Sequence, residues 1–159
     1  MAVKVGDKAP DFTMYDVDKK PRTLKEFVGK KTVLVFYPGA FTGVCTKELC
    51  TFRDSLALLN NINAQVLAAS TDSPYANKVF AEQNKLNFPV LSDVTKEESR
   101  KYAGLYDSFA GIPGFTAAKR SVFVIDGGGI IRYAWISDNP GVEPNYDDVK
   151  TAVNSVSEG

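Results

Sequence analysis

A continuous apolar run occupies residues 32–37, Thr-Val-Leu-Val-Phe-Tyr, and stops at Pro38-Gly39. A run this rich in β-branched residues, without polar alternation, is typical of a central strand covered on both faces. A helical pattern follows from about residue 42 to residue 60. Its apolar residues recur at helical spacing: Cys45, Leu49, Phe52, Leu56 and Leu59. A buried strand followed by a helix with an apolar stripe is typical of α/β folds.

The rest of the chain alternates short apolar runs with helical patterns, the rhythm of an α/β sandwich. The glycine-rich turn at residues 126–129 predicts a hairpin. Because a hairpin accompanies the βα units, we predict one domain over residues 1–159, with a mixed central sheet, helices on both faces and a thioredoxin-like arrangement. Further strands are expected at residues 11–15 (at a sheet edge), 64–70, 89–91, 121–125 and 130–136.

Three further helices are predicted. Residues 73–74, Ser-Pro, provide an N-cap and a proline for the first helical position, and this helix should carry Val79 and Phe80 inward. Residues 95–98, Thr-Lys-Glu-Glu, fit a capping box that opens a short helix. The last helix covers about residues 145–156.

Composition excludes several classes of function. Lysine plus arginine number 19 and aspartate plus glutamate number 19, so the net charge is zero. Such a chain has little electrostatic attraction to the phosphates of nucleic acids. The chain has no histidine, which excludes Ser-His-Asp triads, Cys-His dyads and imidazole metal ligands. No apolar stretch approaches the roughly 20 residues of a membrane span. The N-terminus has no apolar signal-peptide region, so we expect a cytoplasmic protein whose two cysteines are functional thiols.

Cys45 lies where a central strand ends, a Pro-Gly loop follows and a helix begins. Free backbone N–H groups and the positive end of the helix dipole favour a thiolate at such a position. The alternative is a core cysteine that shares a buried stripe with Leu49 and Phe52, since free cysteine is among the most buried residue types.

The spacing Pro38-x-x-x-Thr42-x-x-Cys45, set between a buried strand and a helix, resembles the peroxiredoxin active-site signature. Residues 5–12, Val-Gly-Asp-Lys-Ala-Pro-Asp-Phe, resemble the N-terminal segment of that family. Arg120, just before the strand at 121–125, stands where the family has its active-site arginine. The resemblance covers nearly the whole chain.

The resemblance implies a thiol peroxidase. Cys45 would attack the peroxide, and Thr42 and Arg120 would hydrogen-bond its oxygens. Pro38 would exclude water, and Glu48 matches a position that helps hold the arginine. Each residue also has a plainer interpretation: Thr42 as a helix N-cap, Pro38 as a strand terminator, Arg120 as part of a surface ion pair and Glu48 as a solvated charge.

Cys50 follows Cys45 with four residues between them, a spacing that resembles the peroxiredoxin Q (bacterioferritin comigratory protein) branch. There the second thiol resolves the sulfenic acid of the first. Residues 40–44 and 135–141 look more like AhpE-type enzymes. The resemblance implies hydrogen peroxide and organic hydroperoxides as substrates, a Cys45–Cys50 disulfide, and a thioredoxin-like or other dithiol protein as reductant. Many AhpE-type enzymes are dimers and many peroxiredoxin Q proteins monomers; we expect a homodimer.

Helix geometry restricts this disulfide. On an intact helix, residues five apart lie about 140° around the axis with Cα atoms about 8.6 Å apart, and a disulfide needs about 7 Å or less. A Cys45–Cys50 bond therefore requires the helix to unwind between about Gly43 and Phe52. The alternative is that Cys50 only fills space, which would leave a one-cysteine peroxidase.

Two alternatives come from other classes. A general thiol–disulfide oxidoreductase is disfavoured because its usual Cys-x-x-Cys is absent and Thr42 and Arg120 would have no role. A non-catalytic redox sensor or holdase would keep Cys45 without turning over peroxide. We expect no metal, haem or flavin. The glycines at 127–129 precede no helix and are interpreted as a turn, not a phosphate cradle.

Overall fold

The computed structural model describes residues 2–60 and 63–156, and the side chains of residues 56–60 lie outside that description. Leu56 and Leu59 of the predicted stripe therefore lie outside the described side chains. The remaining members of the stripe, Cys45, Leu49 and Phe52, are all buried. No helix among the described residues is long and apolar enough to cross a membrane.

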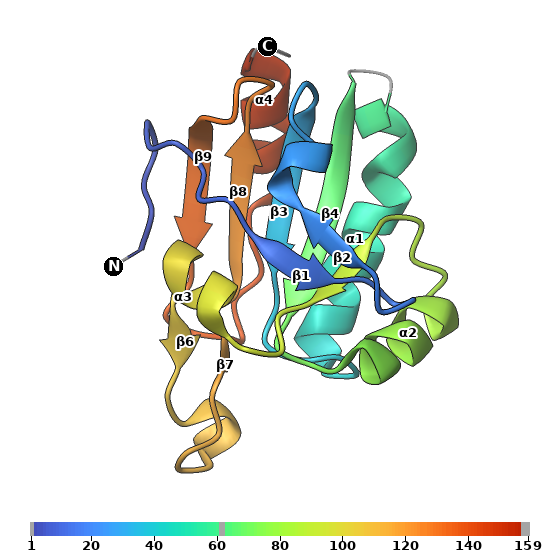
Figure 1. The fold of residues 1–159 in the computed structure, drawn as a ribbon, viewed down its shortest axis with the longest axis vertical. Coiled ribbons are helices and arrows are strands. Elements are labelled where there is room, and N and C mark those ends of the chain that lie inside the picture. Colours follow the sequence, from blue (N-terminus) through green and yellow to red (C-terminus); the bar gives the residue numbers. More distant parts are fainter. Residues whose placement is uncertain (1, 61–62, 157–159) are drawn as a thin grey trace.

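The main sheet has seven strands in the order β2-β1-β5-β4-β3-β8-β9 (Figure 1). The central strand β3 pairs in parallel with β4 and antiparallel with β8, so the predicted mixed sheet is confirmed. Its strands are β1 (Thr13–Tyr15), β2 (Pro21–Thr23), β3 (Lys31–Phe36), β4 (Ala64–Ser70), β5 (Val90–Ser92), β8 (Ser121–Ile125) and β9 (Ile131–Ile136). A separate two-stranded sheet pairs β6 (Leu105–Tyr106) with β7 (Ala117–Ala118).

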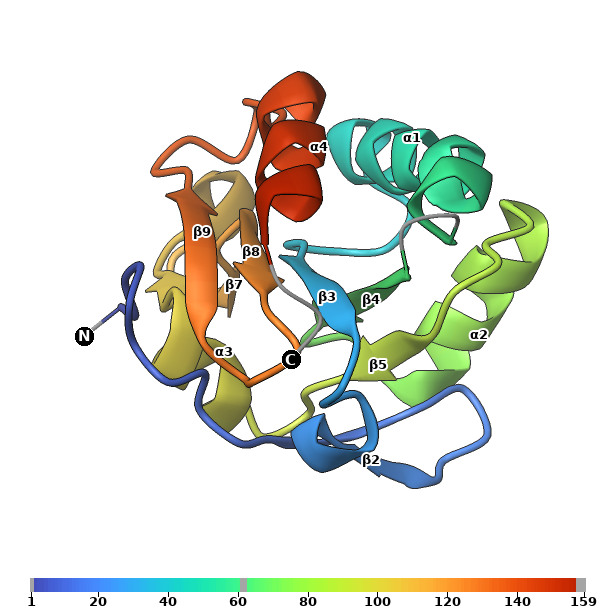
Figure 2. The same cartoon turned by 90° about the horizontal axis from the view of Figure 1, so that it is seen from above.

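Helices cover both faces of the sheet (Figure 2). The helices α1 (Gly43–Asn60), α2 (Pro74–Gln83) and α4 (Tyr146–Ser155) lie on one face, over a core that includes Val33, Val35 and Val122. The helix α3 (Glu97–Tyr102) and the N-terminal segment lie on the other, with the 3₁₀ turn η1 (Leu24–Glu26). A second 3₁₀ turn, η2 (Phe109–Gly111), lies between β6 and β7. All six β3 residues are buried, as predicted for a strand covered on both sides.

Three predictions of detail are wrong. The strand predicted at the sheet edge, β1, lies between β2 and β5, because residues 21–23 add an outer strand that no sequence pattern marked. Val79 is 45% exposed while Phe80 is buried, because neighbouring helix residues lie about 100° apart and only Phe80 faces the core here.

The capping box predicted at residues 95–98 is also absent. Lys96 is the N-cap of α3 in a left-handed conformation, with no side-chain cap. Asp93 supplies the carboxylate instead, because its Oδ2 accepts the Ser99 backbone N–H at 2.7 Å. By contrast, the predicted Ser73 N-cap of α2 is confirmed, and so is the β8–β9 hairpin.

Candidate active site

A loop of residues 37–42 joins the carboxyl end of β3 to α1, and Cys45 lies in the first turn of that helix with its side chain buried. Thr42 immediately precedes the helix. Its hydroxyl donates to the Gly39 carbonyl at 2.9 Å, and its own carbonyl accepts the Thr46 N–H at 2.9 Å. These two hydrogen bonds close the loop on itself and fix the entry into α1.

Arg120 reaches this turn from the start of β8, the strand that pairs antiparallel with β3. Because Ser121 pairs with Phe36 in the β3–β8 ladder, the residue before β8 lies beside the end of β3. The Arg120 Nη2 lies 3.2 Å from the Cys45 Sγ, although the two residues are 75 positions apart in the chain. A guanidinium at this distance stabilises a thiolate by a charge-assisted hydrogen bond.

Each nitrogen of the Arg120 guanidinium has a partner. Nη1 forms a 2.9 Å ion pair with Glu48 Oε1, and Nε donates to the Pro140 carbonyl at 2.9 Å. The Arg120 and Glu48 side chains are 2% and 0% exposed. The alternatives of a surface ion pair and a solvated glutamate are therefore wrong. A cation held at three nitrogens is oriented before any substrate arrives.

The second oxygen of Glu48, Oε2, is buried and has no hydrogen-bond partner. Burial raises the pKa of Glu48 to about 7, against the opposing effect of Arg120. Burial thus favours the protonated carboxyl group of Glu48, and Arg120 favours its carboxylate. Arg120 contacts both this carboxyl group and the Cys45 sulfur, so it links the two.

The loop between β3 and α1 has an anchor that the sequence analysis missed. Asp72 Oδ2 accepts the Ala40 N–H at 2.8 Å and the Ser70 hydroxyl at 2.8 Å. Pro38, two residues before Ala40, is buried. Asp72 follows β4, which is parallel to β3. Loops after parallel strands meet at one sheet edge, and this rule could have identified Asp72.

Two aromatic residues support the same loop. Phe41 has a positive φ of 67° and is 53% exposed, and its ring packs edge-on against Phe80 of α2 with centroids 5.4 Å apart. Tyr37 is the first residue after β3, and its hydroxyl donates to Asn77 Oδ1 of α2 at 2.6 Å. Burial raises the pKa of Tyr37 well above its usual range, so this side chain remains a neutral donor.

Cys50 lies on a different side of α1. Its thiol is half-buried and donates to Asn84 Oδ1, at the C-terminal end of α2, at 3.7 Å. Both cysteines are free, and α1 is continuous from Gly43 to Asn60. The structure therefore brings Cys45, Arg120 and Glu48 together, with Thr42 and Pro38 in the adjoining loop, while Cys50 contacts another helix.

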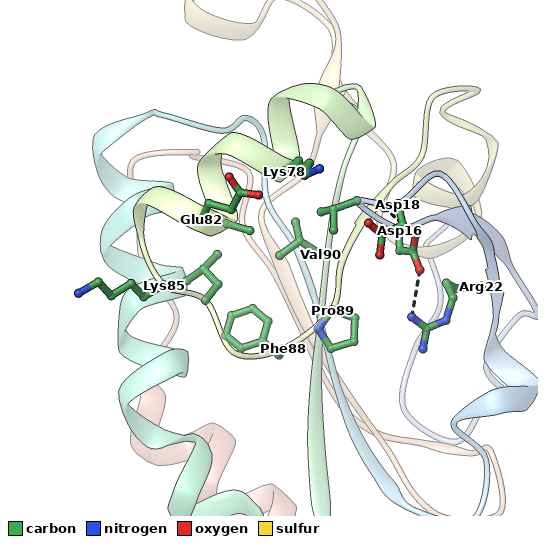
Figure 3. A pocket seen from close by; sticks show the side chains of 12 residues that line it. Asp16, Asp18, Arg22, Lys78, Glu82, Lys85, Phe88, Pro89 and Val90 are labelled. Atoms are coloured by element: carbon green, nitrogen blue, oxygen red, sulfur yellow. Dashed lines mark hydrogen bonds and ion pairs between the residues drawn. The ribbon is translucent and has the colours of Figure 1, made fainter.

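A separate hollow of about 370 Å³ lies between α2 and the β1–β2 turn (Figure 3). Charged side chains of both signs surround it, including the Asp16–Arg22 ion pair, with Phe88 and Val90 beneath. None of the predicted site residues lines this hollow. Among the described residues, no three histidine, cysteine or acidic side chains lie close enough together to hold a metal ion.

Comparisons with known proteins identify the family. Residues 5–134 match the AhpC/TSA family. Alkyl hydroperoxide reductase E of Mycobacterium tuberculosis is 41% identical over 134 residues, which cover 83% of this chain and 84% of that protein. Chloroplastic peroxiredoxin Q of Triticum aestivum is 35% identical over 133 residues, 84% of this chain and 59% of that protein.

Solved structures give the same result for the fold. The crystal structure of peroxidoxin BcpB from Mycobacterium tuberculosis matches with a TM-score of 0.83 and 29% identity, over 96% of this chain and 97% of that one. A peroxiredoxin-like protein from Aquifex aeolicus matches with a TM-score of 0.83 and 29% identity, over 97% and 88%. The chain thus belongs to the AhpC/TSA family and is a peroxiredoxin, a thiol peroxidase of thioredoxin-like fold.

Proposed function

We propose that this peroxiredoxin reduces hydrogen peroxide and organic hydroperoxides through a Cys45 sulfenic acid, which Cys50 converts into an intramolecular disulfide. The observation that carries the role of Cys45 as the attacking thiol is the 3.2 Å contact between Arg120 Nη2 and Cys45 Sγ. A buried cation on a buried cysteine stabilises the thiolate that attacks peroxide and the oxyanion that leaves.

In the first step the Cys45 thiolate attacks one peroxide oxygen. The S–O bond forms as the O–O bond breaks, and the second oxygen leaves as water or alcohol after taking a proton. Arg120 is oriented toward the sulfur by Glu48 and the Pro140 carbonyl. The Thr42 hydroxyl lies at the start of the same helix turn, where it would hydrogen-bond the peroxide, and Pro38 would exclude water.

In the second step Cys50 attacks the Cys45 sulfenic acid. The two thiols lie on one continuous helix with about 140° between them around its axis, so the first turns of α1 must unwind before the S–S bond forms. This unwinding removes Cys45 from Arg120 and exposes the disulfide. An external dithiol protein of thioredoxin type then reduces the disulfide by exchange.

The remaining features of the cycle are proposals of the same kind. A cytoplasmic location suits a protein that depends on free thiols and on a reductant of this type. A homodimer is favoured by the AhpE-like loop sequences at residues 40–44 and 135–141.

Intact-mass measurement after one equivalent of hydrogen peroxide tests this function on the wild type, Cys50→Ser and Cys45→Ser. The wild type should lose about two mass units, and Cys50→Ser should gain about sixteen or be oxidised further. Cys45→Ser should show neither change. A wild type that gains oxygen without losing two protons supports the one-cysteine cycle, and no rapid change in either protein that keeps Cys45 contradicts the proposal.

A further inference from the structure

The C-terminal end of α2 lies against α1 at the position of Cys50, and among the described residues Asn84 makes the hydrogen bonds between the two helices there. Asn84 caps α2, because its Nδ2 donates to the Phe80 carbonyl at 2.9 Å. Its Oδ1 accepts the Cys50 thiol at 3.7 Å. Its backbone carbonyl accepts Arg53 Nη1 at 2.6 Å. Asn84 therefore binds α1 both at the second cysteine and one turn beyond it.

We propose that Asn84 is a positioning residue for the resolving step: it holds Cys50 in the folded helix and limits the rate at which Cys50 reaches the Cys45 sulfenic acid. This inference rests on the proposed function, in which Cys50 resolves. The unwinding of residues 43–52 must carry Cys50 away from Asn84 and break the S–H···O contact. A substitution that removes the contact therefore lowers the free energy difference between the folded helix and the unwound state.

Arg53 marks the C-terminal end of the segment of α1 that unwinds. It lies just beyond the segment that must unwind, and its 2.6 Å bond to the Asn84 carbonyl does not involve the Asn84 side chain. The helix from Arg53 onward thus stays attached to α2 while the preceding turns open. Cys50 lies three residues before this fixed point, so its thiol stays near the C-terminal end of α2 while the preceding turns open.

The hydrogen bond also affects the chemistry of Cys50. Oδ1 accepts only from the protonated thiol, because a thiolate has no proton to donate. When Cys50 leaves Asn84, its thiol loses a proton to water and the resulting thiolate attacks the Cys45 sulfur. The S–S bond forms, the S–O bond breaks, and the departing hydroxide takes up a proton as water. The sum is one thiol and one sulfenic acid giving one disulfide and one water.

Rapid mixing with one equivalent of hydrogen peroxide, acid quenching and intact-mass analysis give the rate of disulfide formation. Asn84→Ala should raise this rate roughly three- to tenfold, the effect of losing one hydrogen bond that the unwinding must otherwise break. At about tenfold excess of peroxide it should also lower the yield of Cys45 sulfinic acid, because resolution then competes better with a second oxidation.

Two variants separate this role from general loosening of α2. Ser73→Ala removes the N-cap at the other end of the same helix, where Ser73 Oγ accepts the Ala76 N–H at 3.2 Å, and should change the rate less than twofold. Asn84→Asp loses the donor to Phe80 but keeps an acceptor for Cys50, so its rate should stay at or below that of the wild type. A merely structural residue would give acceleration in Asn84→Asp as well.

The possible failures are distinguishable. If the wild type forms the disulfide and Asn84→Ala forms it at the same rate, the positioning role is wrong and the proposed function stands. If Ser73→Ala or Asn84→Asp accelerates as much as Asn84→Ala, the role is again wrong. If the wild type forms no disulfide at all, the resolving function of Cys50 fails, and the inference fails with it.

Discussion

The two cysteines lie five residues apart on one helix, yet their surroundings differ in almost every respect. Cys45 is fully buried and contacts a cation whose three nitrogens are all bound. Cys50 is half-buried, and its polar contact is a long, neutral hydrogen bond to Asn84. Fixed charge suits a thiol that must react where it stands, and a weak contact suits a thiol that must move.

The two cysteines also differ in how many elements contribute the groups around each sulfur. Around Cys45 the supporting groups come from the residue just before β8, from the loop after β9 and from α1 itself, so moving any one of them costs interactions with several elements. Around Cys50 the support comes from the end of a single neighbouring helix. Substitutions near Cys45 should therefore act on the reaction with peroxide, and those near Cys50 on the subsequent conformational step.

The largest effect should come from Arg120→Lys. Lysine keeps the charge but lacks the planar guanidinium whose separate nitrogens reach the sulfur, the carboxylate and the carbonyl, so the rate constant for peroxide should fall about 100- to 1,000-fold, as for loss of a preorganised donor. Stopped-flow measurement of Cys45 oxidation checks this. The control is Arg132→Ala, which breaks the 2.8 Å ion pair to Asp126 in the β8–β9 hairpin and should leave the rate within about twofold. Equal losses in both variants would contradict the special role of Arg120.

The proximity of Arg120 to Cys45 illustrates what the sequence could predict. The strand at 32–37 and the helix after residue 42 follow from local pattern, because burial on both faces leaves a continuous apolar run and a helix leaves a stripe. The Arg120 contact depends on the register between β3 and β8, in which Ser121 faces Phe36. No local pattern encodes that register, and only the resemblance to peroxiredoxins identified the residue.

Glu48→Gln should change how stability depends on pH. The pKa of Glu48 is about 7 in the folded protein against an ordinary value of 4.5, so the folded state holds a proton that the unfolded state releases. Stability should therefore fall as pH rises from 4.5 to 7, by up to about 3 kcal/mol from this group. The glutamine variant should lose this dependence. Urea unfolding across the range measures it.

Glu143→Gln is the matched control for Glu48. A hydrogen bond from Tyr146 and the ion pair with Lys47 lower the pKa of Glu143, so its contribution has the opposite sign: it is present above the ordinary glutamate pKa and is lost as pH falls. This variant should keep the loss of stability between pH 4.5 and 7 that Glu48 causes. If Glu48→Gln and the wild type gave parallel profiles, the buried carboxyl would not be the titrating group.

Asp72→Ala should reduce the rate of Cys45 oxidation about tenfold, because the Ala40 N–H loses a charged acceptor and the loop that holds Thr42 is no longer fixed. The control is Asp126→Ala, since Asp126 likewise accepts backbone N–H groups, at Gly128 and Ile130 in the β8–β9 turn. It should cost stability and leave the oxidation rate near that of the wild type. Rate and unfolding free energy measured on both variants distinguish positioning from folding.

Asp72 and Asn84 mark the limit of the sequence analysis. Each is a single polar residue beside a helix end, and such residues usually face solvent in turns. Their roles arise because β4 lies parallel to β3 and because α2 packs beside α1. The capping box predicted at residues 95–98 was wrong for a related reason. The Asp93 carboxylate, which lies before those residues, accepts the Ser99 N–H in its place.

The smallest effect should come from Lys47→Ala, and it sharpens the contrast between buried and exposed contacts. Lys47 belongs to the segment that unwinds and pairs with Glu143 Oε2 at 3.1 Å, but its side chain is 73% exposed. Exposed ion pairs contribute about 0 to 1 kcal/mol, so disulfide formation should change less than about twofold, well below the change expected for Asn84→Ala. Quenched-flow mass analysis of the two variants side by side makes the comparison. A larger effect for Lys47→Ala would mean that the outer face of α1 controls its unwinding, and the contacts of Cys50 would then be secondary.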